Sequence, residues 1–131
     1  MGKPGRKAVQ LILPGLIRDY GIDFVVANGE NAAAGFGLTY DTAMELLDAG
    51  VDVITSGNHI WDQRDIIPHL DSDLPVLRPL NYPPTVPGVG FIERGGVLVI
   101  SLIGRTFVGS FDCPFRAMDS LLDSFGKKHK I

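Results

Sequence analysis

Residues 51–59 read VDVITSGNH, and this stretch decides the fold class of the chain. The β-branched run Val51–Thr55 is typical of a strand buried within a parallel sheet. Gly57 lets the chain turn sharply after that strand, so we expect Asn58 and His59 to project beyond its carboxyl end. Ligands bind at this end of the strands in open α/β sheets. The stretch therefore predicts an α/β fold that carries polar side chains on a ligand-binding rim.

A second stretch repeats this arrangement earlier in the chain. Residues 23–28 read DFVVAN, a strand pattern, and a glycine, Glu30 and Asn31 follow directly. A helical pattern lies between the two strands, which gives the strand-helix-strand order of parallel α/β proteins. Parallel neighbours end at the same edge of a sheet, so Glu30 and Asn31 are expected to share a rim with Asn58 and His59.

The remaining pattern consists of helices, short strands and one hairpin, and its boundaries follow from glycine, proline and capping residues. Val97–Ile103 and the strand before it flank a glycine pair, the signature of an antiparallel hairpin. The pattern predicts, in order, a loop over residues 1–4, a helix over 5–20 kinked or broken at Pro14 and capped by Gly21, a helix after the N-cap Thr39, a short helix over 61–67, a short strand over 75–80, an irregular segment over 81–88, a hairpin over 90–103, and a helix opened by Asp112 and Pro114.

Composition narrows the class of protein. The chain has 131 residues, of which 45% are hydrophobic and 21% charged, so it is expected to fold as one globular domain. Its apolar runs are shorter than the roughly 20 residues of a membrane span, and no signal peptide is expected. One cysteine excludes an internal disulfide and fits a cytoplasmic location. A net charge of −3 argues against an extended nucleic-acid surface.

The four rim residues carry the chemistry of a cation site. The Glu30 carboxylate offers a hard anionic oxygen that can bridge two cations, and the Asn31 and Asn58 amides offer neutral carbonyl oxygens. His59 is suited to protonate a leaving alkoxide, because an imidazole titrates near neutral pH. Either turn alone is an ordinary pattern of Asn and Gly. A doubly wound domain whose Asn-His turn has no ligand therefore remains an alternative.

The sequence also resembles a known family. Its Gly57-Asn58-His59 block is similar to that of calcineurin-like metallophosphoesterases, and the fuller string resembles their YmdB-like bacterial phosphodiesterase branch. The resemblance covers essentially the whole chain. The matching segments are residues 3–9 (KPGRKAV), 27–33 (ANGENAA), 35–39 (GFGLT), 57–62 (GNHIWD), 78–83 (RPLNYP) and 104–105 (GR).

This resemblance implies a fold, a reaction and a set of roles. The fold would be a partial, layered metallophosphoesterase type: a mostly parallel sheet with flanking helices and one β-hairpin. The reaction would be two-metal hydrolysis of small phosphodiesters or nucleotides, including cyclic nucleotides, with iron or manganese. By resemblance, Glu30 would bridge the metals, Asn31 and Asn58 would complete their shells, His59 would donate the proton, and Asn81, Tyr82 and Arg105 would line a substrate pocket.

The chain also departs from the family pattern. The family begins with a strand ending in a metal-binding Gly-Asp, and further histidine ligands lie in its second half. Residues 1–131 are therefore expected to form a single, incomplete domain, an internal fragment with weak or absent metal binding and little activity. Strands left without neighbours expose backbone groups, so self-association is expected. The alternative is a non-catalytic remnant that binds a nucleotide or a partner.

Overall fold

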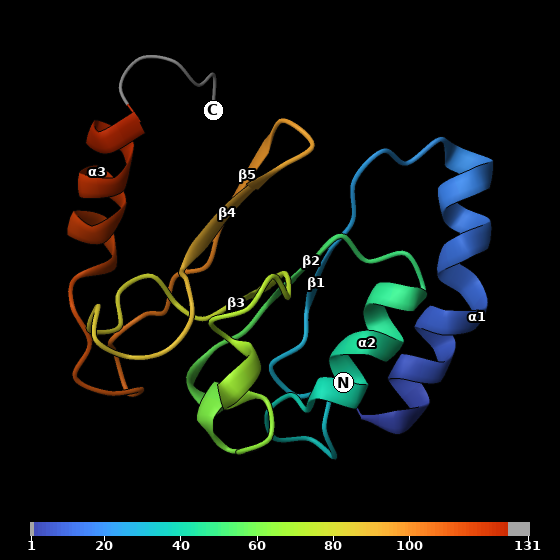
Figure 1. Ribbon diagram of the computed structural model, residues 1–131, viewed down its shortest axis with the longest axis horizontal. Helices are drawn as coiled ribbons and strands as arrows, with labels where there is room; N and C mark the ends of the chain where they lie inside the picture. The colour runs from blue at the N-terminus through green and yellow to red at the C-terminus, as the bar shows by residue number, and fades with distance from the viewer. Residues whose placement is uncertain (1, 126–131) are drawn as a thin grey trace.

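The three parallel strands predicted to organise the chain lie at the centre of the structure, a computed structural model that describes residues 2–125 (Figure 1). They are β1 (Val26–Asn28), β2 (Val53–Thr55) and β3 (Val76–Leu77), in the order β1-β2-β3. Asn28 pairs with Thr55, and Ile54 pairs with Val76. Since β2 has a neighbour on both sides, Val53 and Ile54 are fully buried, as the β-branched pattern predicts.

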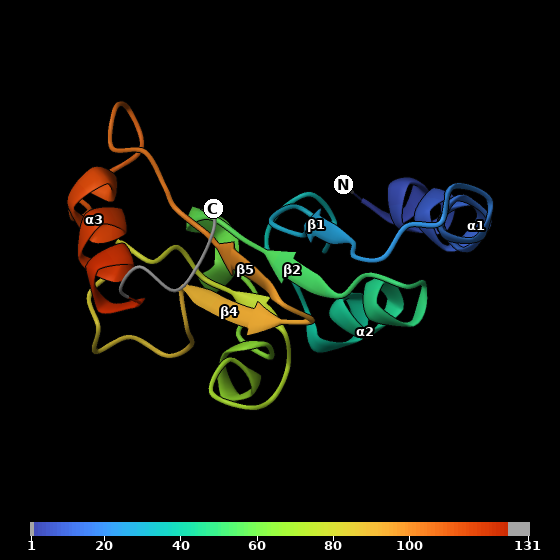
Figure 2. The ribbon, with the colours of Figure 1, turned by 90° about the horizontal axis from the view of Figure 1, so that it is seen from above.

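Alternate residues of these strands face two different layers, because side chains along a strand point to opposite faces. Ile54 and Val76 join the larger core beneath the helices α1 (Lys3–Tyr20) and α2 (Tyr40–Asp48). Val53 and Leu77 pack with Val99 on the opposite face. Val99 comes from an antiparallel hairpin, and Figure 2 shows this hairpin beside the parallel strands. The hairpin strands are β4 (Phe91–Arg94) and β5 (Val97–Ile100). The mixed α/β architecture with one hairpin is confirmed.

Helix α1 begins earlier than the sequence pattern predicts. Residues 3 and 4 are helical, so the predicted N-terminal loop is wrong there. Pro4 fits because the first turn of a helix needs no backbone donor at that position. The helix also continues through Pro14 without ending. Gly21 caps it in the left-handed conformation, with φ of 60°, and this cap is confirmed.

The helix predicted over residues 61–67 is absent. In its place are two 3-10 turns, η1 (Asn58–Trp61) and η2 (Ile67–His69), the second of which contains Pro68. Thr39 is confirmed as the N-cap of α2, where it exchanges hydrogen bonds with Thr42. Within residues 2–125, no helix has both the length and the apolar character needed to cross a membrane.

The last helix, α3 (Pro114–Phe125), begins at the predicted proline. It lies at the opposite end of the molecule from α1, with the strands between the two helices (Figure 1). The segment before α3 is tied to the residues after β3: the Asp112 N–H donates to the Asn81 carbonyl at 3.2 Å. Residues 81–88 form turns and bends without regular structure, as their prolines predict.

Candidate functional site

Strands β1 and β2 end side by side, and this places the two predicted turns next to each other. Asn28 and Thr55 are opposite one another in the parallel register. The pairing continues one residue further, because the Gly29 N–H donates to the Thr55 carbonyl at 2.9 Å. The turn that carries Glu30 and the turn that begins at Ser56 therefore start at the same edge of the sheet.

The Glu30 side chain lies directly against Gly57. A Cβ atom placed on Gly57 would overlap the Glu30 carboxylate, so a larger residue there would displace the carboxylate from this position. Gly57 has φ of −143°, outside the left-handed region, so the glycine matters here for the close approach of Glu30 and not for the backbone conformation. The sequence pattern predicts only a sharp turn at Gly57 and does not reveal this contact. The Glu30 backbone is held as well, by a 3.0 Å bond from its N–H to Asn28 Oδ1.

Asn58 and His59 follow Gly57 in the first turn of η1. Asn58 is exposed and His59 is half-buried. Nδ1 of His59 lies 2.7 Å from Oδ2 of Asp62, and the imidazole ring meets the Phe36 ring edge-on at 5.2 Å between centroids. A carboxylate partner fixes the proton on Nδ1 and leaves Nε2 as the nitrogen that exchanges a proton with a ligand.

Asp62 is a site residue that the sequence reasoning missed. It follows His59 by three residues, the separation at which side chains on one helical turn meet. This spacing is visible in the sequence and is the signal that could have identified it. In the structure Asp62 orients the imidazole predicted to act as the proton donor.

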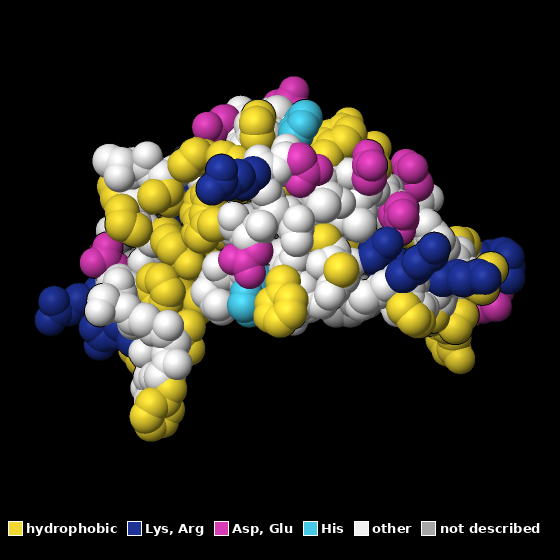
Figure 3. Space-filling model, turned by 90° about the horizontal axis from the view of Figure 1, so that it is seen from below, with side chains coloured by type: hydrophobic (Ala, Val, Ile, Leu, Met, Phe, Trp, Pro, Cys, Tyr) yellow, Lys and Arg dark blue, Asp and Glu magenta, His cyan; other side chains and the backbone are white. Residues whose placement is uncertain are grey.

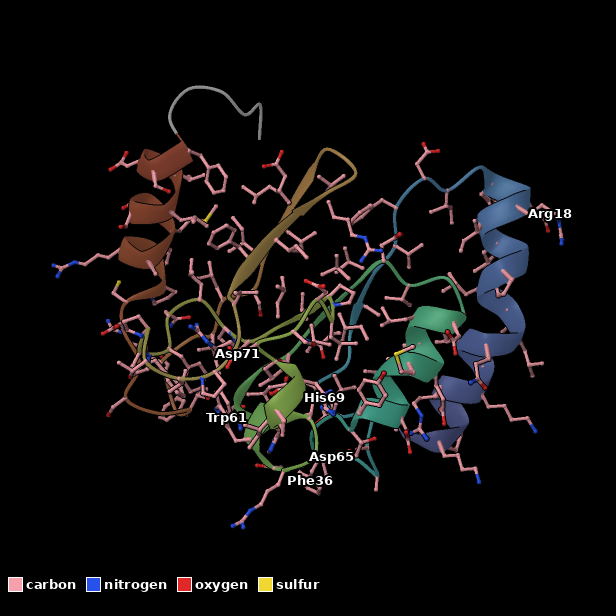
Figure 4. All side chains as sticks on the ribbon, in the orientation of Figure 1. Arg18, Phe36, Trp61, Asp65, His69 and Asp71 are labelled. Atoms are coloured by element: carbon pink, nitrogen blue, oxygen red, sulfur yellow. The ribbon has the colours of Figure 1, made fainter. Side chains whose placement is uncertain are left out.

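Two side chains from other segments, Arg6 and Gln63, donate hydrogen bonds to the loop after β1. Arg6 of α1 donates to the Ala32 carbonyl, and its Nε lies 2.6 Å from the Glu45 carboxylate of α2. Gln63, just after η1, donates to the Phe36 carbonyl at 2.8 Å. Figure 4 shows Phe36 and Trp61 beside the same end of the molecule. These contacts fix the turn that contains Glu30 and the half-buried Asn31.

The other three predicted site residues come from segments on the α3 side, where the Tyr82 ring also meets Trp61 of η1. Asn81, Tyr82 and Arg105 line a cavity of about 700 Å³ on the α3 side, and none of the four rim residues lines it. Asn81 is 2% exposed and its amide is bonded to backbone. It donates to the Ile103 and Asp112 carbonyls at 2.9 and 2.8 Å and accepts from the Ile103 N–H at 3.0 Å. The structure thus joins Glu30 to the Asn58-His59 turn and ties the Asn81 amide to backbone groups.

The rim fits a cation in the kind of ligand it offers. One carboxylate, amide oxygens and an imidazole are hard or intermediate donors of the type that divalent cations accept. The carboxylate also rests on the glycine that precedes Asn58. Residues 2–125 contain no group of three or more His, Cys, Asp or Glu side chains placed to hold a metal ion. The described residues therefore fit one side of a cation site rather than a full coordination shell.

Comparison with known proteins supplies relatives in curated sequences. The chain is 39% identical to the 2',3'-cyclic-nucleotide 2'-phosphodiesterase of Bacillus subtilis (strain 168) over 132 residues, which cover 98% of this chain and 50% of that protein. It is also 39% identical over 80 residues to the putative phosphatase/phosphodiesterase MG246 of Mycoplasma genitalium, covering 61% of this chain and 28% of that protein. The chain spans half or less of the length of these relatives.

Solved structures agree with the sequence relatives. A hypothetical protein from Thermus thermophilus superposes with a TM-score of 0.86 and 48% identity, over 99% of this chain and 50% of that one. A novel phosphatase from Mycoplasma pneumoniae superposes with a TM-score of 0.80 and 29% identity, over 92% and 46%. The model of the family described as YmdB-like protein matches residues 1–131. The chain belongs to the YmdB-like protein family.

Proposed function

We propose that this chain supplies one side of the active site of a cation-dependent phosphodiesterase, with small phosphodiesters such as cyclic nucleotides as substrates. The observation that carries the proposal is the contact of the Glu30 carboxylate with Gly57, which puts a carboxylate beside the Asn58-His59 turn. The names of two relatives, a cyclic-nucleotide phosphodiesterase and a putative phosphatase/phosphodiesterase, support the same class of reaction.

Three residues of the rim would hold the cations, for which iron or manganese is proposed. Glu30 would bridge two ions, and Asn31 and Asn58 would each complete the shell of one. Bound cations would supply positive charge to the phosphoryl oxygens and lower the pKa of a water molecule. The amide ligands are neutral, so they leave more of that positive charge available than carboxylates would.

His59 would act on the leaving group. Water would release one proton to solvent as its oxygen adds to phosphorus, the bond from phosphorus to the ester oxygen would break, and that oxygen would take the Nε2 proton of protonated His59. Asp62 accepts the Nδ1 proton in a 2.7 Å hydrogen bond and so holds the ring in the orientation that presents Nε2. The Phe36 ring edge limits rotation of the imidazole from one side.

For the 131-residue chain by itself we propose weak cation binding and low activity. Its rim offers one carboxylate and two amides, fewer oxygens than the roughly six to eight that calcium-like sites use or the octahedral shell of magnesium. The affinity for a cation rises with the number of ligand atoms that the folded chain holds in place before the cation binds.

The test is hydrolysis of bis(4-nitrophenyl) phosphate and of a 2',3'-cyclic nucleotide with added manganese. We expect a low rate that a chelator removes and that His59→Ala lowers about 100-fold or more. His69→Ala is the matched control, because the His69 ring packs on Tyr40 at 4.3 Å between centroids and His69 is not one of the four rim residues. An equal rate in the His59→Ala variant contradicts the proposal. Nucleotide binding without turnover supports the non-catalytic alternative.

A further inference from the structure

The cavity of about 700 Å³ on the α3 side carries a distinct set of side chains. It lies between α3, the segment that leads into α3, and the irregular residues after β3. Figure 3 shows hydrophobic side chains gathered at the α3 end of the molecule, with Lys or Arg side chains beside them. The lining residues used below are Arg78, Tyr82, Arg105, Phe111, Cys113 and Arg116. We call this feature the arginine cavity.

Positive charge dominates the arginine cavity. Three arginines, Arg78, Arg105 and Arg116, are among its lining residues, together with a single acidic residue, Asp112. No ion pair joins any of the three arginines to a carboxylate within residues 2–125. Three arginines and one acidic residue around a common cavity give it a net positive charge, which favours an anionic occupant.

Arg78 distinguishes this cavity from an ordinary basic surface. Arg105 and Arg116 are exposed, as most arginines are, but Arg78 is only 6% exposed. Its Nη1 donates to the Pro79 carbonyl at 2.9 Å, whereas its buried Nε has no hydrogen-bond partner among the described residues. Burial lowers the pKa of Arg78, and the Asp71 carboxylate opposes this effect only in part. Burial of a cation that has an N–H without a hydrogen-bond acceptor destabilises the folded state, unless an anion lies close enough to offset this loss.

Aromatic side chains form another wall of the arginine cavity. The Tyr82 and Phe111 rings lie 4.9 Å apart between centroids, at 54°. Flat apolar rings next to guanidinium groups are the combination that holds a base beside its phosphate. The Trp61 ring of η1 meets the Tyr82 ring edge-on, at 5.7 Å between centroids, and this contact helps to hold the Tyr82 ring in place.

We propose that the arginine cavity binds a phosphate group, carried by inorganic phosphate or by a nucleotide, without a metal ion. A guanidinium group binds phosphate through paired N–H donors, and three arginines are among the residues that line this cavity. The proposal uses none of the residues Glu30, Asn31, Asn58 and His59. It therefore stands or falls independently of the proposed hydrolase.

The first test measures binding by calorimetry in the presence of EDTA, which removes any contribution from a cation site. Inorganic phosphate and adenosine monophosphate are titrated in separate experiments. We expect saturable binding that Arg105→Gln and Arg116→Gln each weaken about tenfold or more, because each variant loses a charge-assisted hydrogen bond. Arg94→Gln is the matched control, since Arg94 is exposed at the end of β4 and does not line the cavity.

The second test uses the single cysteine of the chain. Cys113 lines the cavity, and the Arg116 backbone N–H holds the pKa of its thiol below the usual value, with further lowering by the Arg105 and Arg116 charges. The thiolate therefore forms at lower pH than in the unfolded chain, and alkylation by iodoacetamide can be followed near neutral pH. We expect phosphate to slow this alkylation in a saturable way, and to slow it at the concentrations that saturate calorimetric binding.

Each outcome bears on the proposal. Tighter binding of the nucleotide than of phosphate supports a nucleotide as the occupant, and Phe111→Leu should then remove the difference. Equal binding of both supports the bare phosphate group. Absence of saturation below about 10 mM, weaker than a millimolar site, overturns the proposal. Equal weakening by Arg94→Gln and Arg105→Gln, or alkylation of Cys113 that phosphate leaves unchanged, overturns it as well.

Discussion

The Glu30 carboxylate lies against the backbone of Gly57, and this contact joins the turn after β1 to the turn after β2. Two segments distant in the chain thereby form one surface. The parallel register of Asn28 with Thr55 creates the contact, and the absence of a side chain at Gly57 makes room for it. The candidate site therefore depends on strand pairing and on one glycine.

Replacing Gly57 tests this relationship. We expect Gly57→Ala to lower the free energy of unfolding by about 0.5–1 kcal/mol, because the new methyl group overlaps the Glu30 carboxylate, which is the end of a flexible side chain and can move aside. Urea denaturation measures the change. Gly104→Ala is the control, since a Cβ atom at Gly104 has no neighbour within 4 Å and should leave stability equal or slightly raised.

A double-mutant cycle locates the cause of that loss. In a Glu30→Ala background the added methyl group has no carboxylate to displace, so Gly57→Ala should cost clearly less there. An unchanged cost in both backgrounds would show that Glu30 does not lie on Gly57.

Arg6 should stabilise the loop that carries Glu30. It is 8% exposed and bonds to Ala32 and Glu45, so we expect Arg6→Ala to lower the free energy of unfolding by about 2–3 kcal/mol. Arg18→Ala is the matched control, because its pair with Asp19 is exposed and should contribute less than about 1 kcal/mol. Thermal or urea unfolding of the two variants gives the comparison, and equal losses would contradict the assignment.

Asn81 should behave as a structural residue. Its buried amide makes three hydrogen bonds to backbone groups, which Asn81→Leu leaves without partners. We expect this variant to lower the free energy of unfolding, measured by urea denaturation, by about 2–4 kcal/mol. Asn58→Ala, at an exposed position, should change stability by less than about 0.5 kcal/mol. A stable Asn81→Leu variant would restore Asn81 as a candidate ligand-binding residue.

Self-association remains a prediction that the surface supports. An apolar groove of about 350 Å³ lies between α1 and β1, and Ile12, Leu16 and Val26 on its walls are 56%, 41% and 47% exposed. Apolar groups of this kind associate in water. We expect light scattering to report a mass that grows with concentration, and Ile12→Lys to reduce that growth. A constant monomer mass for the unmodified chain would contradict the prediction.

The sequence predicted the framework because its signals are local and periodic. The β-branched run before Gly57, the Thr39 cap, the glycine hairpin and Pro114 each specify an element through residues close in sequence. The same locality explains the errors. The helix predicted over residues 61–67 has only 3-10 turns at its ends, and the loop predicted at Pro4 is wrong because a proline also fits a first helical turn.

The candidate site was predictable only in part. Glu30 and His59 could be assigned to one rim, because parallel strands end at a common edge. The close approach at Gly57 and the backbone bonds of Asn81 depend on contacts between distant segments, which no sequence spacing reveals. The cavity that Asn81, Tyr82 and Arg105 line together depends on the path of the residues after β3, for which the sequence pattern predicts only irregular structure.

The central claim is that the turns after β1 and β2 form one cation-binding surface. Paramagnetic broadening of backbone amide signals by substoichiometric Mn²⁺ tests it directly, and this measurement detects weak binding. We predict selective broadening of the amides of residues 29–31 and 57–59 together, with loss of both sets in the Glu30→Gln variant. Broadening of only one turn, or broadening that survives Glu30→Gln, would contradict the account.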